Sequence, residues 1–131
     1  MKTARRVALL ASSGLGLALA ACQPHYDGLE IRYINGVGEF SADGITIKEG
    51  QALAVEVTPL SDNRYEDYEK FDLVELESFN PGILVVSPST DVDRFVFIGV
   101  STGKTAVDVT INGGDVDTIE ATVEAQSAGG R

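Results

Sequence analysis

The feature that most constrains the fold of this chain is an alternation of apolar and polar side chains with a period of two, which recurs from Gly28 onward. Successive side chains of an extended strand point to opposite faces, so this period is typical of half-buried β-strands. In one segment Leu53, Val55 and Val57 occupy one face, and a glutamate and smaller residues occupy the other. No part of this region shows the 3.6-residue period of an amphipathic helix. We therefore expect an all-β body.

Turn residues divide the alternating region into short segments. Gly, Asn, Asp and Pro interrupt it, and Asn112-Gly113-Gly114-Asp115 has the composition of a hairpin turn. The expected strands are a split first strand (29–33 with 45–47), then 53–57, 71–79, 83–86, 95–98, 107–111 and 119–123. Seven short strands in about 100 residues are typical of an immunoglobulin-like sandwich. We predict a seven-stranded immunoglobulin-like β-sandwich over residues 28–125, followed by a disordered polar tail over 126–131.

Three segments of this body carry short motifs in a consistent order: Gly50–Pro59, Leu76–Pro81 and Ile98–Val107. They resemble the Gly-x-x-x-x-Leu-x-(Val/Ala)-x-x-x-Pro, Trp-x-Ser-x-(Asn/Asp)-Pro and Gly-x-x-x-Gly-x-(Ala/Thr)-x-(Ile/Val) segments of bacterial Ig-like domains of group 2. The resemblance covers about residues 45–123. The chain departs from the family at Leu76, where the family usually has tryptophan, but either side chain can fill a core.

The N-terminal residues have the pattern of an export signal. Met1–Arg6 carries three cations and no acid, and Val7–Ala21 is an uncharged and largely apolar run. A membrane-spanning helix needs about 20 apolar residues, so this run is too short to be one. We predict a secretory signal peptide over residues 1–21.

The end of the apolar run, Leu19-Ala20-Ala21-Cys22, resembles the bacterial lipobox. The resemblance implies cleavage after Ala21, a diacylglycerol on Cys22 and acylation of the new amino terminus, which together would hold the protein on a membrane. Gln23 follows the cysteine where an Asp would favour the inner membrane, so the lipoprotein resemblance favours the outer membrane. The alternative is an ordinary signal peptide that precedes a free cysteine.

Composition opposes several classes of function. The net charge of −10 opposes binding to nucleic acid, which depends on cations that neutralise phosphates. The single cysteine excludes an internal disulfide and a multi-cysteine zinc site. The single histidine, His25, lies on the predicted tether 22–27, so no Ser-His-Asp or Cys-His arrangement can form inside the fold. A carboxylate pair could hydrolyse glycosides, but a small sandwich leaves little room for a substrate cleft. We expect no enzymatic activity.

Acidic side chains concentrate in the three loops that such a sandwich places at one end. Successive strands reverse direction, so the loops B–C, D–E and F–G share a pole. Carboxylate oxygens there could bind Ca²⁺, or a cationic partner could dock, with Tyr65 and Tyr68 as contact residues. The acids could instead form only a solvated surface. The candidate calcium ligands are Asp62, Glu66, Asp67, Asp91, Asp93 and Asp115.

Two functions fit these expectations. The first is a non-enzymatic envelope lipoprotein that displays one Ig-like module for binding or adhesion to an unknown protein or glycan. The second is a structural accessory subunit of a larger envelope assembly. In either case a lipid on Cys22 would place the acidic pole near the membrane, unless an extra strand before residue 45 reverses the polarity of the sandwich.

Overall fold

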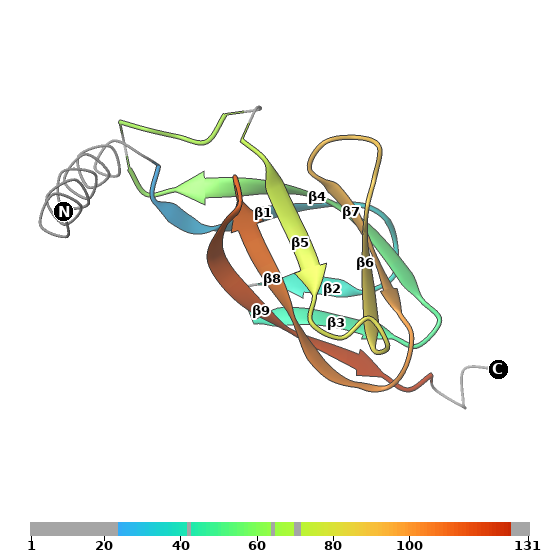
Figure 1. Ribbon diagram of the computed structural model, residues 1–131. Coiled ribbons are helices and arrows are strands. Elements are labelled where there is room, and N and C mark those ends of the chain that lie inside the picture. The colour runs from blue at the N-terminus through green and yellow to red at the C-terminus, as the bar shows by residue number, and fades with distance from the viewer. Residues whose placement is uncertain (1–23, 42, 64, 70–71, 127–131) are drawn as a thin grey trace, which may run out of the picture.

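The computed structural model describes residues 24–41, 43–63, 65–69 and 72–126. The predicted signal peptide 1–21, the lipobox and Cys22 lie outside these residues. The described residues form two β-sheets that pack face to face, which confirms the predicted all-β sandwich (Figure 1). They contain no helix that is long and apolar enough to span a membrane.

The first sheet has the strand order β1-β4-β7-β6. Its strands are β1 (Tyr26–Gly36), β4 (Ala52–Ser61), β7 (Arg94–Gly99) and β6 (Leu84–Pro88). All neighbouring strands in this sheet are antiparallel. The order corresponds to strands A, B, E and D of an immunoglobulin-like sandwich.

The second sheet has the strand order β2-β3-β9-β8-β5. Its strands are β2 (Glu39–Ser41), β3 (Gly44–Lys48), β9 (Gly114–Glu124), β8 (Gly103–Ile111) and β5 (Val74–Ser78). The pair β3–β9 is parallel, and the other pairs are antiparallel. From β9 to β5 the order corresponds to that of strands G, F and C in such a sandwich.

The described residues form nine strands, where the sequence led us to expect seven. The expected split first strand is instead three strands, with β1 in one sheet and the hairpin β2–β3 in the other. The chain changes sheets at Gly36 and Gly38, which have φ values of 97° and 149°. A Cβ at Gly36 would lie 2.1 Å from the carbonyl oxygen of Ala52, so only glycine fits this crossing.

The core lies between the two sheets and is built from alternate positions of each strand. The predicted inward-facing side chains are confirmed, none being more than 6% exposed: Leu53, Val55, Val74, Leu76, Val107 and Val109. Phe40 of β2 packs edge-on against Phe97 of β7, with ring centroids 5.5 Å apart. The short strand β2 therefore closes one side of the core.

The two ends of the sandwich differ in which chain segments they carry. Tyr26 at the start of β1 pairs with Ser61 at the end of β4, so β1 begins at the end that carries the β4–β5, β6–β7 and β8–β9 connections. Glu124 at the end of β9 accepts a hydrogen bond from the backbone of Glu49, at the opposite end. Two strands, β1 and β2, precede β3, so the chain reverses direction twice before β3 begins. The first strand therefore still begins at the end that carries the three acidic loops, as expected for a single first strand (Figure 1).

Candidate functional site

The three predicted acidic loops lie at the same end of the sandwich, which we call the acidic end. The β8–β9 turn is tied to the β4–β5 connection by two bonds of 2.8 Å, in which Asn112 N–H donates to the Leu73 carbonyl and Leu73 N–H donates to Asn112 Oδ1. The β6–β7 loop is tied to β4, since Val57 N–H donates to the Asp93 carbonyl at 2.8 Å. The acidic end is therefore held together by backbone hydrogen bonds and by the side chain of Asn112.

The candidate ligands on the β4–β5 connection each contact a different partner. Asp62 Oδ1 lies 3.2 Å from His25 Nδ1, and Asp67 Oδ1 accepts the N–H of the next residue at 2.9 Å. The Glu66 carbonyl accepts a bond from Ser61 Oγ at 3.0 Å. His25 is exposed, as expected of a tether residue, but its carbonyl also accepts the N–H of Asp62 at 3.0 Å. The sandwich thus begins within the predicted tether.

The two tyrosines of this connection differ in their environments. Tyr65 is 84% exposed, whereas Tyr68 is half-buried and packs against the core. Tyr68, Glu56 and Asp93 line a pocket of about 510 Å³ beside β4. Of the two predicted contact residues, Tyr65 is therefore the one presented to solvent.

The candidate ligands on the other two loops, Asp91, Asp93 and Asp115, lie in three different environments. Asp91 Oδ2 accepts a bond of 2.9 Å from Arg94 Nη1. Asp93 has a left-handed backbone with φ of 66°, and its buried Oδ1 has no hydrogen-bond partner among the described residues. Burial, and then the charge of Glu56, raises the pKa of Asp93. A hydrogen bond to Asp115 is the main cause of a raised pKa at Asp108.

The candidate calcium ligands do not form one cluster. Across the part of the chain that the structure describes, no three His, Cys, Asp or Glu side chains converge closely enough to hold a metal ion. Asp108 also belongs to the acidic end, since it contacts Asp115. The sequence did not predict this residue, because the contact depends on the pairing of β8 with β9. The expected calcium effect stays a prediction.

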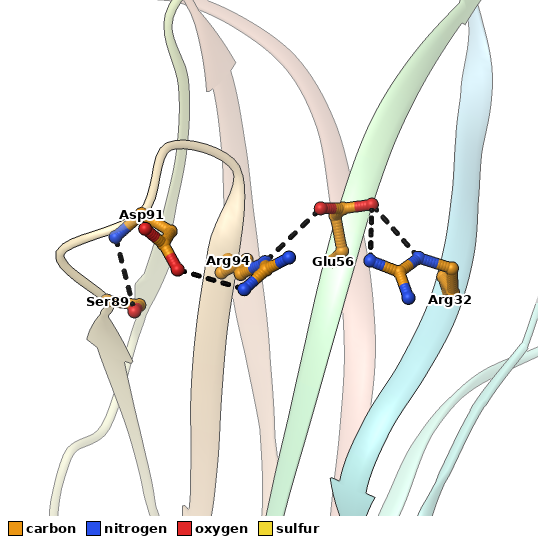
Figure 2. Close-up of polar contacts among 5 residues, drawn as sticks. All are labelled: Arg32, Glu56, Ser89, Asp91 and Arg94. Atoms are coloured by element: carbon orange, nitrogen blue, oxygen red, sulfur yellow. Dashed lines mark hydrogen bonds and ion pairs between the residues drawn. The ribbon is translucent and has the colours of Figure 1, made fainter.

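A row of ion pairs crosses the outer face of the first sheet beside the acidic end (Figure 2). Glu56 Oε1 accepts bonds from Arg32 Nε at 3.1 Å and from Nη2 at 3.0 Å, and Oε2 accepts from Arg94 Nε at 3.2 Å. Arg94 also binds Asp91, so the row links β1, β4, β7 and the β6–β7 loop. The hydrogen bonds from Arg32 and Arg94 lower the pKa of Glu56. Sequence reasoning missed this row because it needs the register of three strands.

A polar contact joins the two sheets at the acidic end. Tyr26 Oη of β1 donates to Asp117 Oδ2 of β9 at 2.9 Å. Burial and the hydrogen bond to Asp117 raise the pKa of Tyr26 far above its usual value. Asp117 of β9 therefore ties the second sheet to the first strand of the other sheet.

Comparisons with known proteins find this architecture in surface layer proteins. No family model and no curated protein matches the chain. The solved structure of surface layer protein SbsC, domains 1–6, has a TM-score of 0.53 and 19% identity, and covers 79% of this chain and 14% of that chain. The structure of the S-layer protein SbsC domains 4 and 5 has a TM-score of 0.51 and 18% identity, over 73% of this chain and 54% of that one.

A third structure, of the S-layer protein rSbsC(31-844), has a TM-score of 0.50 and 19% identity, over 75% of this chain and 14% of that one. This chain therefore spans only part of each of these proteins. At such identities the likeness shows a shared fold.

Proposed function

We propose that this chain is a non-enzymatic, cell-surface module of the bacterial envelope, anchored by a lipid on Cys22. The observation that carries the proposal is that its sandwich has the fold of domains from a surface layer protein. The N-terminal pattern supports it independently, because a basic segment, a short apolar run and Leu19-Ala20-Ala21-Cys22 resemble a lipoprotein signal. The strand order and the three family-like motifs support a bacterial Ig-like domain.

The anchor would set the orientation of the module. Cys22 precedes Tyr26 by four residues, which span at most about 13 Å in an extended chain. A lipid on Cys22 would therefore hold the acidic end close to the membrane and present the opposite end outward. Anionic head groups would repel the acidic end within a Debye length, roughly 8 Å at physiological salt, and divalent cations would relieve that repulsion.

The role of the module is binding or adhesion, with the end away from the membrane as the presented surface. That end carries exposed apolar side chains, among them Val37, Phe79 and Val100, which are suited to contact with a protein or a glycan. The second candidate, a structural accessory subunit, is favoured by the likeness to S-layer domains, which are parts of larger chains.

Co-purification separates the two roles. An epitope-tagged full chain is expressed, the membranes are solubilised in detergent, and bound proteins are identified with and without cross-linking. A fixed partner in constant ratio indicates an accessory subunit, whereas binding of the purified chain to a glycan or surface protein indicates adhesion. Recovery of the chain from the soluble fraction, with distribution unchanged in Cys22→Ala, would contradict the envelope proposal.

A further inference from the structure

A groove lies between β5 and β6 on one side of the sandwich. In the strand order of the described residues, each is the last strand of its sheet, so neither has a neighbour on this side. The groove has a volume of about 460 Å³. One wall is formed by Leu73 and β5. The other wall is formed by Val86 of β6 and by residues 88–95, which run from the end of β6 through the β6–β7 loop into β7. We call it the β5–β6 groove.

The walls of this groove combine apolar and acidic side chains. Leu76 and Phe95 are buried in its floor, Val86 is half-buried, and Val92 is exposed at its rim. Its acids are Glu75, Glu77, Asp91 and Asp93. Arg94 is the single cation among the described lining residues, and its guanidinium already binds two carboxylates. The groove therefore suits a ligand with both apolar and positive groups.

The backbone of β5 directs hydrogen-bonding groups into the open side. At its two ends, Asn112 N–H donates to the Leu73 carbonyl and Phe79 N–H donates to the Ala106 carbonyl. Alternate residues of an antiparallel strand bond to the same neighbour, so the odd-numbered positions between these ends face β8. The N–H and C=O groups of Val74, Leu76 and Ser78 then point away from β8, which is the arrangement that accepts an added strand.

We propose that an extended segment of a partner protein, with apolar and basic residues in alternation, binds in the β5–β6 groove as an added strand on β5. One face of that strand would contact Leu76 and Phe95. Side chains on its other face would lie beside Glu75 and Glu77, where opposite charges on neighbouring strands stabilise a sheet. Glu77 already lies opposite Asp108 on β8, so a cation on the open side would offset a like-charge pair.

The same charges argue against a second copy of this chain as the occupant. Pairing β5 with β5 of another copy would bring Glu75 and Glu77 of both copies together, and like charges opposite each other destabilise a sheet. The inference deepens the proposed function, on which it rests for the presence of a partner protein. Its test uses the purified full chain in solution, so its failure would leave the envelope proposal standing.

Peptide binding tests the charge and the pattern. The probe is a fluorescent peptide of about seven residues that alternates lysine and valine, a length that spans β5. We expect saturable binding to the full chain by anisotropy, weakened about tenfold or more in the double variant Glu75→Lys/Glu77→Lys. The matched control, Glu120→Lys/Glu124→Lys, has the same net charge and lies on β9, so it should bind nearly as well as the original chain.

Measurements on the backbone distinguish the addition of a strand to β5 from electrostatic attraction to the protein surface. On binding, the amides of Val74, Leu76 and Ser78 should become protected from hydrogen exchange. N-methylation of the peptide should abolish binding when it blocks the alternate N–H groups that face β5, and should not do so when it blocks the other alternate set. Equal weakening in both double variants, equal binding of a glutamate–valine peptide, unchanged exchange at these amides, or no binding to the full chain would each overturn the inference.

Discussion

Truncation of Leu76 tests the packing that defines this fold. Leu76 is 6% exposed and lies opposite Val109 of β8, which is fully buried. Leucine-to-alanine changes in cores cost about 2–5 kcal/mol. Leu76 also lines the floor of the β5–β6 groove at a sheet edge, where neighbours can partly refill the space, so we expect Leu76→Ala to cost about 2–3 kcal/mol.

Thermal and urea unfolding of the full chain, followed by circular dichroism, measure this cost. For a domain of this size 1 kcal/mol corresponds to roughly 4–8 °C, so Leu76→Ala should lower the melting midpoint by about 10 °C or more. Glu77→Ala is the matched control, because it changes the next, exposed residue of β5 and should stay within about 0.5 kcal/mol. An unchanged midpoint in Leu76→Ala would mean that this face of β5 does not contact the core.

Further predictions concern charge, backbone and cations. Glu56→Gln should lower stability near neutral pH, with the deficit disappearing as pH falls below about 4.3, because hydrogen bonds from two arginines lower the pKa of Glu56 and only its ionised form is stabilised. Asp93→Asn should do the opposite, because the raised pKa of Asp93 means that its ionised form destabilises the folded chain. At pH values above roughly 4 the variant should have a higher melting midpoint than the original chain, and at lower pH the two midpoints should match; a lower midpoint of the variant at neutral pH would refute this. Gly36→Ala should destabilise the sandwich more than Gly113→Ala, since both glycines have positive φ but only the first would place a methyl group against the Ala52 carbonyl; equal losses would rule out this clash. Millimolar Ca²⁺ should raise the melting midpoint and a chelator should reverse it; an unmoved midpoint would leave the acidic end as a solubilising surface.

The body of the fold follows from local pattern, whereas its N-terminal part depends on contacts distant in sequence. The alternation around Val55 predicts correctly which face of β4 is buried, because a buried face on a strand imposes a period of two. The residues before Ile45 do not show that β1 leaves one sheet and that β2 enters the other. That exchange is decided at Gly36, where the backbone passes close to Ala52, a contact between residues far apart in the sequence.

For the candidate site, too, one part could be predicted from the sequence and another could not. Composition and topology place the acidic loops at one end, and the hydrogen bonds between Asn112 and Leu73 agree with that expectation. The partner of each acid could not be predicted, because it depends on strand register and side-chain geometry. Glu56 lies opposite Arg94 because of the register between β4 and β7. Asp108 contacts Asp115 because β8 and β9 pair as a hairpin.

Metabolic labelling of the full chain with a fatty acid, followed by mass spectrometry of its N-terminal peptide, tests whether Cys22 carries a lipid. We expect the original chain to carry the label on a mature N-terminus that begins at Cys22. The variant Cys22→Ala should lose the label and remain an uncleaved precursor, because both the acyl attachment and the processing site are removed. A mature chain with a free thiol at Cys22, or label retained by Cys22→Ala, would contradict the lipid-anchored envelope module.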